Sequence, residues 1–382
     1  MIPRSAATTL TRLSKGFRVL VVTGPRQSGK TTLARATFPG RPYVSLEVTH
    51  EREFAARDPR GFLARFPDGG ILDEIQHVPN LLSYIQTIVD EDQRPGLFVL
   101  TGSQNFALLS KVTQSLAGRA AILHLLPLSA TELRHASIDH GTVDKVLLNG
   151  LYPAVWAHKI EAREWYANYV TTYLERDVRQ LTNVQDLLLF QRFLGLCAAR
   201  TGQMLNLAGL AVDCGVAQST ARAWLSILQA SYIIFLLPPH HVNLGKRLVK
   251  TPKLYFHDAG LAGFLIGIAD QVHMGLHPAR PALFETFVVG EFLKHRFNLG
   301  LRSNLYFWRD NVGTEVDVLV EEPAGLFPIE IKSGRTFQPE FLSSLRRFLG
   351  YAGARAYGAG LVYGGDESYI YSEVTVRSWR EI

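Results

Sequence analysis

Residues 24–31 have the spacing of a loop that binds phosphate groups. They read Gly-Pro-Arg-Gln-Ser-Gly-Lys-Thr and fit the pattern G-x-x-x-x-G-K-[ST]. Glycines at both ends let backbone N–H groups turn towards the β- and γ-phosphates of a nucleotide. Lys30 supplies a mobile charge for the γ-phosphate, and Thr31 supplies a hydroxyl ligand for Mg²⁺. The residues that we expect to bind ATP are Gly24, Pro25, Arg26, Gln27, Ser28, Gly29, Lys30, Thr31 and Thr32. The alternative is a glycine-rich turn that ends in a solvated lysine.

An acidic pair farther along the chain is suited to holding that metal ion and activating water. Residues 69–74 read Gly-Gly-Ile-Leu-Asp-Glu, so the apolar part of the expected strand is short, with Ile71 and Leu72 before the acids. We expect Asp73 to hold Mg²⁺ through its water shell and Glu74 to act as the general base. The alternative is an ordinary pair of acids on the surface.

Two further polar positions are candidates for contact with the γ-phosphate. An apolar run at 97–101 is followed by Gly-Ser-Gln-Asn at 102–105, which places Ser103 where a phosphate sensor would lie. Arg119 ends the segment 115–119 and is a candidate for the same role, either in its own subunit or across the interface of a homo-oligomer. The alternative is that Arg119 caps a helix or pairs with a surface acid.

The C-terminal third holds a second group of charged residues. Residues 315–320 and 326–332 alternate apolar with polar positions, and a turn at 323–324 between them predicts a β-hairpin. One register places Asp317 across from Glu330 on the same face. Like charges in facing positions destabilise a hairpin unless a cation such as Mg²⁺ offsets them.

Each candidate residue needs a strand or a helix to position it. The run 19–23 predicts a strand before the glycine-rich loop and residues 32–36 predict a helix after it, which is the context that a P-loop requires. Residues 161–181 and 186–199 repeat apolar residues at three- and four-residue steps, which predicts two helices. Residues 203–237 predict two short helices and a strand in a helix-turn-helix outline.

The basic segment that follows this outline predicts a hairpin wing. If the region binds DNA, the exposed side of the second helix would contact it through Gln218, Thr220 and Arg222. The basic segment would neutralise phosphates through Lys246, Arg247 and Lys250. A winged helix can also serve only as a packing or relay domain, so both interpretations stay open.

Together these motifs resemble those of a family of bacterial and archaeal AAA-type ATPases that carry a C-terminal domain of unknown function. The segments that carry the resemblance are Thr23–Thr31, Leu72–Gln76, Leu100–Ser103, Ser115–Arg119, Lys253–Leu261 and Pro328–Lys332. The resemblance runs over nearly the full length of the chain. It implies an ATP-binding module joined to a winged-helix-like region and a restriction-endonuclease-like, PD-(D/E)xK-type domain.

By the same resemblance, Asp317 and the spacing Glu330-x-Lys332 are similar to the active site of restriction-endonuclease-like nucleases. In such sites two carboxylates hold a metal ion, and the lysine helps to orient or deprotonate water. An upstream helix at 282–297 offers Glu285 and Glu291 as the additional acid, and the resemblance favours Glu285. The alternative is a solvated hairpin with an ordinary Glu–Lys pair. Cleavage of a strand and binding without cleavage both stay open.

Length and composition agree with a protein of several domains. A chain of 382 residues with 47% hydrophobic and 19% charged residues predicts two or three packed domains. We expect an α/β fold with a P-loop ATPase domain (AAA-type) at 1–130, a helical and winged-helix region at 131–272, and an α/β restriction-endonuclease-like domain at 273–382. A formal charge of +6 permits contact with nucleic acid but does not require it.

The apolar stretches, the N-terminal segment and the cysteines indicate where in the cell the protein is expected. The apolar stretches are too short to span a membrane, and no export signal is visible. Cys197 and Cys214 lie in apolar helical surroundings without the spacing of metal ligands. We therefore expect a cytoplasmic protein in which both cysteines are reduced core residues.

The sequence predicts an Mg²⁺-dependent ATPase that couples ATP binding and hydrolysis to DNA handling through the winged-helix and nuclease-like domains. An alternative hypothesis is a slow switch, whose nucleotide state controls how the C-terminal domain engages a protein or nucleic acid without cleaving it. A third is that the nuclease-like domain carries the activity and the ATPase gates it. The expected partners are ATP, DNA and further copies of the chain, with no membrane.

Overall fold

The computed structural model describes residues 1–103, 115–174, 186–240 and 251–382. Spatial contacts divide the chain into two compact units. The first unit contains Met1–Leu128, Ala230–Tyr232 and Lys294–Arg302, and the second contains Ser129–Gln229, Ile233–Leu293 and Ser303–Ile382. The first unit ends close to the boundary predicted at residue 130, whereas residues on both sides of the boundary predicted at 272 belong to the second unit. The division into three domains stays a prediction.

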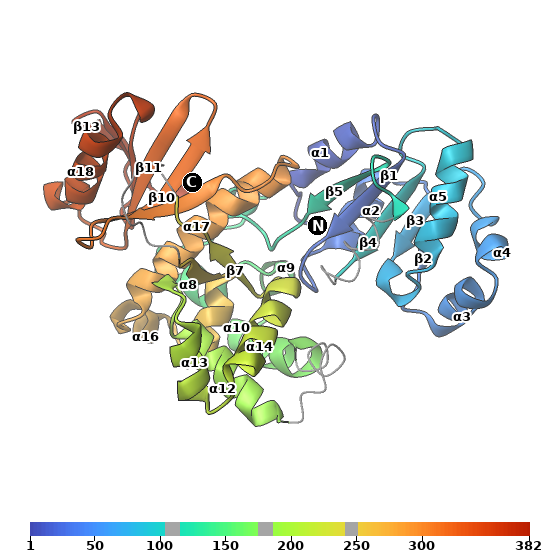
Figure 1. Ribbon diagram of the computed structural model, residues 1–382, viewed down its shortest axis with the longest axis horizontal. Helices are drawn as coiled ribbons and strands as arrows, with labels where there is room; N and C mark the ends of the chain where they lie inside the picture. The colour runs from blue at the N-terminus through green and yellow to red at the C-terminus, as the bar shows by residue number, and fades with distance from the viewer. Residues whose placement is uncertain (104–114, 175–185, 241–250) are drawn as a thin grey trace. The chain divides into compact units, whose positions relative to one another are not determined.

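The first unit is built on a five-stranded sheet in the order β2-β3-β4-β1-β5 (Figure 1). Its strands are β1 (Val19–Thr23), β2 (Tyr43–Ser45), β3 (Gly70–Asp73), β4 (Phe98–Gly102) and β5 (Ala120–His124). Every pairing in this sheet is parallel. Parallel neighbours need long crossover connections, which here carry helices. The strands predicted before the glycine-rich loop, before the acidic pair and before Ser103 are therefore confirmed.

Helices cover both faces of this sheet. They are α1 (Ala6–Leu13), α2 (Lys30–Thr37), α3 (Thr49–Arg57), α4 (Pro59–Leu63) and α5 (Leu81–Glu91), with a 3₁₀ turn η1 (Ile75–His77). Val19 and Val21 of β1 belong to a core with residues of α3, α4 and α5, whereas Leu20 and Val22 belong to a core with α1 and α2. A strand buried on both faces is apolar throughout, which explains the unbroken run at 19–23.

The second unit begins as a set of helices. They are α7 (Ala130–His135), α8 (Val143–Asn149), α9 (Pro153–Ala157), α10 (Ala162–Tyr169) with a π-helical turn η2 (Val170–Leu174), α12 (Leu187–Ala198), α13 (Leu207–Cys214), α14 (Gln218–Ala230), α15 (Ala259–Leu265), α16 (Gln271–Leu276) and α17 (Arg280–Asn298). The helices predicted at 161–181 and 186–199 are found over their described residues. Both cysteines are free and buried, as expected. Among the residues described, no helix is long and apolar enough to cross a membrane.

A small sheet follows the predicted helix-turn-helix. Strand β7 (Ile234–Leu237) pairs antiparallel with β8 (Lys253–Phe256), which also pairs with the short β6 (Gln203–Met204). Gly215 ends α13 in the left-handed conformation, with φ 80°, which suits a glycine at this position. The two helices and the strand after them thus agree with the sequence outline. The predicted basic wing, with Lys246, Arg247 and Lys250, lies outside the described residues, and the winged-helix interpretation stays a prediction.

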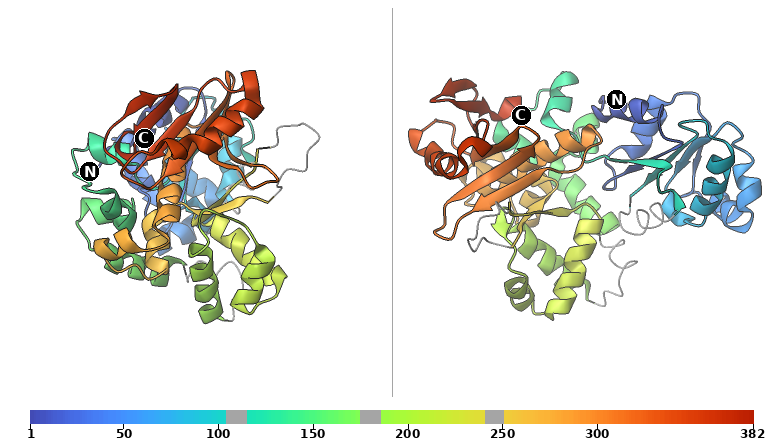
Figure 2. Two further views of the ribbon diagram at one scale, coloured as in Figure 1. Left: turned by 90° about the vertical axis from the view of Figure 1, so that its left-hand side faces the viewer. Right: turned by 45° about the horizontal axis from the view of Figure 1, so that its top comes forward.

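The chain ends in a six-stranded sheet in the order β13-β14-β12-β11-β10-β9 (Figure 2). Its elements are β9 (Leu305–Arg309), β10 (Glu315–Glu322), β11 (Gly325–Lys332), β12 (Gly360–Tyr363), β13 (Tyr369–Tyr371), β14 (Val374–Ser378), α18 (Ser343–Ala352) and the 3₁₀ turns η3 (Pro339–Leu342), η4 (Gly353–Arg355) and η5 (Trp379–Glu381). Val318 pairs with Ile329 and Glu322 with Gly325, which confirms the predicted hairpin and its register. Helix α18 packs Leu345 against one face of the sheet.

Asp258, in the motif Lys253–Leu261, organises the helical part of the second unit. Its buried carboxylate caps α15 by accepting from the Leu261 N–H at 2.9 Å, and it also accepts from the Leu151 N–H at 2.7 Å and from the Tyr166 hydroxyl. A Cβ at Gly260, the second residue of α15, would collide with that hydroxyl and with the backbone nitrogen of Gly150. Hydrogen bonding therefore accounts for Asp258 in the motif, and close packing accounts for Gly260.

We expect Asp258→Ala to destabilise the second unit by about 3 kcal/mol, because it leaves two backbone N–H groups and a buried hydroxyl without their acceptor. Thermal unfolding followed by calorimetry measures the effect. The matched control is Asp213→Ala, which removes a half-exposed partner of Arg200 and is expected to cost less than about 1 kcal/mol. Equal melting temperatures for the two variants would contradict the assigned role.

Candidate functional site

The predicted ATP-binding residues gather at one edge of the sheet in the first unit. The loop 24–29 follows β1, Glu74 follows β3 and Ser103 follows β4. Since these strands are parallel, the residues that follow them lie at the same edge, where ligands of open α/β sheets bind. The structure thus brings together segments that are far apart in the sequence.

Glycines and Lys30 shape the phosphate-binding loop. An added Cβ at Gly24 would collide with the Leu125 carbonyl oxygen. Gly29 has φ 91° and caps the N-terminus of α2. The ammonium group of buried Lys30 donates to the carbonyl oxygens of Pro25 at 2.7 Å and Gly24 at 3.2 Å, so its side chain folds back over the loop. The start of α2 adds partial positive charge at the same place.

The residues expected to hold Mg²⁺ are in direct contact. The Thr31 hydroxyl donates to Oδ1 of Asp73 at 2.7 Å. The same carboxylate accepts from the hydroxyls of Thr101 and, at 3.0 Å, Tyr43. Burial, with help from Asp73, raises the pKa of Tyr43 to about 12, so this phenol stays a donor. A hydroxyl and a carboxylate side by side offer the oxygen ligands that Mg²⁺ prefers, so the donor set fits the expected metal.

Glu74 lies beside this pair in an uncommon backbone conformation. Its φ of 55° and ψ of 46° are left-handed, which is rare for a residue other than glycine and is often found at functional sites. The carboxylate accepts from the Gln76 amide and, at 3.3 Å, from the Ser103 hydroxyl. Ser103 therefore lies within the predicted site, while the neighbouring Gln104 and Asn105 fall outside the described residues.

Arg119 lies at the opposite end of the strands. It precedes β5, and its carbonyl oxygen accepts from the N–H of Val19, the first residue of β1, at 3.2 Å. Its guanidinium pairs with Asp90, with Nη2 2.8 Å from Oδ2. The alternative of pairing with a surface acid therefore describes Arg119 in this chain. Contact with the γ-phosphate of its own subunit does not fit this position, and contact across an oligomer interface stays a prediction.

Sequence reasoning missed two residues that support the site. Arg4 donates to the carbonyl oxygens of Ser28 at 2.6 Å and Leu126 at 2.7 Å, so it braces the loop from the N-terminal segment. Tyr43, on β2, donates a hydrogen bond to the carboxylate of Asp73. Neither residue belongs to a recognisable local pattern, because both act through contacts with distant parts of the chain.

A third missed residue, Tyr232, extends the site by a chain of polar contacts. Its hydroxyl donates to Oγ1 of Thr23, the last residue before the loop, at 3.4 Å, and lies 2.8 Å from Nδ1 of His124. The His124 ring in turn packs 5.0 Å from the ring of Phe297. Tyr232 has a left-handed φ of 56° and lies in the turn between α14 and β7. The position of this turn is thus tied to the strand that carries the phosphate-binding loop.

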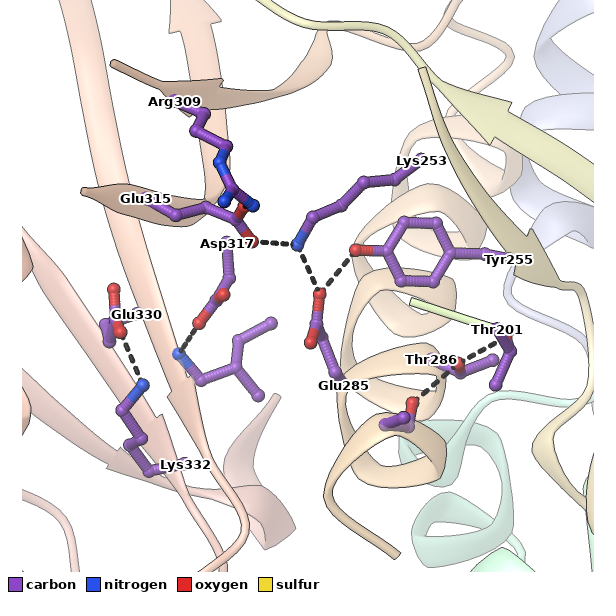
Figure 3. A network of polar contacts seen from close by, with 12 residues as sticks. Thr201, Lys253, Tyr255, Glu285, Thr286, Arg309, Glu315, Asp317, Glu330 and Lys332 are labelled. Atoms are coloured by element: carbon purple, nitrogen blue, oxygen red, sulfur yellow. Dashed lines mark hydrogen bonds and ion pairs between the residues drawn. The ribbon is translucent and has the colours of Figure 1, made fainter. Parts of the chain in front are cut away.

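The second predicted site lies in the second unit, between α17, β8 and the hairpin β10–β11 (Figure 3). Lys253 and Tyr255 point from β8 towards Glu285 on α17. The Lys253 ammonium is 3.0 Å from Oε1 of Glu285 and also pairs with Glu315, and the Tyr255 hydroxyl donates to the same Glu285 oxygen. The family motif contains Lys253 and Tyr255, but no sequence signal connects them with these carboxylates.

The predicted acidic pair lies next to this ion-pair cluster. Oδ2 of Asp317 accepts from the Ile331 N–H at 2.8 Å, and Oε1 of Glu330 pairs with the Lys332 ammonium. Burial, followed by the charges of Glu285 and Glu330, raises the pKa of Asp317 well above its ordinary value. Burial also raises the pKa of Glu330, against the opposing effect of Lys332.

Lys253 keeps its charge in these surroundings. Burial acts to lower its pKa, but the carboxylates of Glu285, Asp317 and Glu315 outweigh that effect, so the pKa lies above the usual lysine value. Glu285, which the resemblance implies as a metal ligand, is already occupied by Lys253 and Tyr255. Within the described residues no group of three His, Cys, Asp or Glu side chains is placed to hold a metal ion. The donor set therefore does not fit the metal of a nuclease-like site.

Comparisons with known proteins divide the chain into three matched segments. Residues 16–134 match the family described as AAA domain. Residues 140–272 match the domain of unknown function DUF8612, and residues 280–381 match the domain of unknown function DUF4143.

Two mycobacterial proteins are similar over most of the chain, namely the uncharacterized protein Mb2031c of Mycobacterium bovis and the uncharacterized protein Rv2008c of Mycobacterium tuberculosis. Each is 31% identical to this chain over 376 residues, which covers 98% of this chain and 82% of the relative. The Walker-type ATPase PABY2304 of Pyrococcus abyssi is a similar solved structure, with 17% identity, a TM-score of 0.47, and coverage of 69% of this chain and 96% of that chain.

The burial of the His124 ring predicts a dependence of stability on pH. Burial lowers the pKa of His124 from 6.5 to about 4. Between these values the unfolded chain binds a proton that the folded chain does not, so stability falls as the pH falls. Acidification from about pH 7 to about pH 5 is expected to cost about 2 kcal/mol through this residue. Melting temperatures at the two pH values measure the loss, and His124→Gln, which cannot be protonated, should lose less than the wild type. An equal loss in both proteins would contradict the assignment.

Proposed function

Because the chain belongs to the family of the two mycobacterial proteins and carries an AAA-type P-loop ATPase domain at residues 16–134, we propose that it hydrolyses ATP with the help of Mg²⁺. The observation that carries this proposal is the contact of 2.7 Å between the Thr31 hydroxyl and Asp73, with Glu74 next in the chain. A loop that binds phosphate, a pair of oxygen ligands for the metal and a carboxylate for water are thus gathered at one edge of a sheet.

Each residue of this group has a distinct task. Lys30 exchanges its contacts with Pro25 and Gly24 for the phosphate oxygens of ATP. Thr31 and Asp73 would hold Mg²⁺, which neutralises charge on the phosphates when bound. Glu74 accepts a proton from the water that attacks the γ-phosphate, which yields ADP and inorganic phosphate. The hydrogen bonds from Gln76 and Ser103 orient that carboxylate.

The proposal also gives a role to Arg119 in an oligomer and to helix α14 in binding DNA. Arg119 exchanges its partner Asp90 for the γ-phosphate that a neighbouring subunit of a homo-oligomer binds, and so completes the ATPase site of that subunit.

DNA is the proposed macromolecular partner. Gln218 and Arg222 are exposed on α14 and Thr220 is half-buried, which leaves this helix available for contact with a duplex. The formal charge of +6 permits the same partner.

A second candidate function is a slow nucleotide-controlled switch, and the contact between Tyr232 and Thr23 favours it. Thr23 immediately precedes the phosphate-binding loop, so a ligand that moves the loop acts on the hydroxyl of Tyr232. Tyr232 lies in the short turn of the chain that joins α14 to β7. A change in nucleotide state can therefore bias the turn between these two elements, provided that ATP binds the two arrangements of the turn with different affinity.

Steady-state ATP hydrolysis, with and without duplex, single-stranded and branched DNA, tests the first function. Lys30→Ala is expected to abolish nucleotide binding, and Glu74→Gln is expected to keep binding but lower turnover by about 10²- to 10⁴-fold. Lys15→Ala and Glu91→Gln change exposed residues of the same types and are the matched controls. Turnover that survives in Glu74→Gln would refute the role of this residue, and tight ATP binding with negligible turnover in the wild type would favour the switch.

The switch makes a separate prediction for Tyr232. ATP should change the rate of amide hydrogen exchange at residues 230–234 in the wild type, because the loop and the Tyr232 hydroxyl share the end of β1. Tyr232→Phe, which removes that hydroxyl, should lose most of the change while still binding ATP. Tyr369→Phe, on β13 of the second unit, is the control. An unchanged response in Tyr232→Phe would remove the switch as a candidate.

A further inference from the structure

The carboxylates that the resemblance assigns to a metal ion enclose a lysine instead. We propose that the ammonium group of Lys253 is the resident cation of the cluster formed by Glu285, Glu315, Asp317 and Glu330, and that this cluster binds no divalent metal. On this proposal the C-terminal domain binds or supports a partner and does not cleave phosphodiesters by a metal-dependent route. The inference concerns the second unit alone and is independent of ATP hydrolysis.

The environment of Lys253 is that of a fully engaged cation. Its side chain is 3% exposed, and Figure 3 shows the ammonium group between Glu285 and Glu315. It lies 3.0 Å from Oε1 of Glu285 and pairs with Oε1 of Glu315. It also lies 5.6 Å from the centre of the Phe307 ring, on the electron-rich face that attracts cations. Two carboxylates and an aromatic ring thus surround an ammonium group that has three protons to donate.

The charges of the cluster are nearly balanced without a metal ion. The cationic side chains are Lys253, Arg309, which is 3.0 Å from Glu315, and Lys332, which pairs with Glu330. These three charges face four carboxylates. A divalent ion would change the net charge of the cluster from −1 to +1, so it would not improve the balance of charge, and it would have to displace cations that already bind the carboxylates.

The remaining place for a metal ion is beside Glu330. Its Oε2 atom is buried and has no hydrogen-bond partner in the parts of the chain that the structure describes. Asp317 lies on the facing strand of the hairpin, and one of its oxygens is bound by the Ile331 N–H. Mg²⁺ can be held by two carboxylates and water, but here one oxygen of Asp317 is held by the Ile331 N–H and one oxygen of Glu330 by the Lys332 ammonium. The third acid, Glu285, is held by Lys253 and Tyr255.

The lysine also has a structural consequence. Lys253 and Tyr255 come from β8, which lies in the segment that matches DUF8612, whereas Glu285 and Glu315 lie in the segment that matches DUF4143. The buried ion pair therefore fastens the small sheet to the C-terminal domain inside the second unit. Removal of one partner would leave the others buried and uncompensated.

Binding of Mn²⁺ to the full-length chain, measured by electron paramagnetic resonance, tests the proposal. Asp73→Asn serves as the background, because it removes the metal ligand of the ATPase site. This variant is expected to bind no Mn²⁺, and its melting temperature should be the same with Mn²⁺ and with EDTA. One bound Mn²⁺ that is lost when Asp317→Asn is added would overturn the proposal. ATP hydrolysis plays no part in either readout, so failure here and failure of the ATPase assignment are distinguishable.

Lys253→Met provides the second arm. Loss of the ammonium group should lower the melting temperature by on the order of 5 °C or more, since Glu285 and Glu315 lose their shared partner. Lys159→Met changes an exposed lysine of the same unit and should leave the melting temperature unchanged. A Lys253→Met protein as stable as Lys159→Met would overturn the role of Lys253 as the resident cation. The Mn²⁺ measurement on Asp73→Asn decides the metal question even if Lys253→Met does not fold.

Discussion

The parallel pairing of β1, β3 and β4 is the constraint on which the ATPase site depends. Parallel strands end at one edge, so the loop after β1 lies near the acids at the end of β3, and Thr31 contacts Asp73 there. The same constraint sends Arg119 to the opposite edge, because it stands before β5 and not after it. The sheet thus decides which charged residues can reach a phosphate within one subunit.

Local patterns were sufficient to predict the elements that carry the chemistry. The run 19–23, the loop 24–31 and the hairpin around residues 323–324 each combine a regular period with an unambiguous turn, and the structure has all of them. Tyr43 and Tyr232 were beyond such reasoning. Each acts through a single hydroxyl that reaches a residue far away in the sequence, and no spacing rule encodes such a contact.

Lys253 shows the same limit in the second unit. From the sequence, Asp317, Glu330 and Lys332 have the spacing of a nuclease-like site, and the hairpin register does place the acids on facing strands. The cation that fills the cluster comes from β8, more than sixty residues before Asp317. A buried lysine among acids and a metal site have the same acids, so their sequence patterns are alike. They differ in whether the fold places the ammonium group of a lysine from elsewhere in the chain between the acids.

The two groups of acids therefore represent two solutions to the burial of negative charge. At the ATPase site, neutral hydroxyl groups bind Asp73, and hydroxyls can be exchanged for a metal ion and phosphate at small electrostatic cost. In the second unit, permanent cations bind the acids, and their replacement would require an ammonium group to leave a buried position. A site whose hydrogen-bond partners can be exchanged for ligands suits catalytic turnover. A site whose acids are permanently paired with a buried lysine suits a structural role. The site that can exchange its ligands is accordingly the one in the first unit.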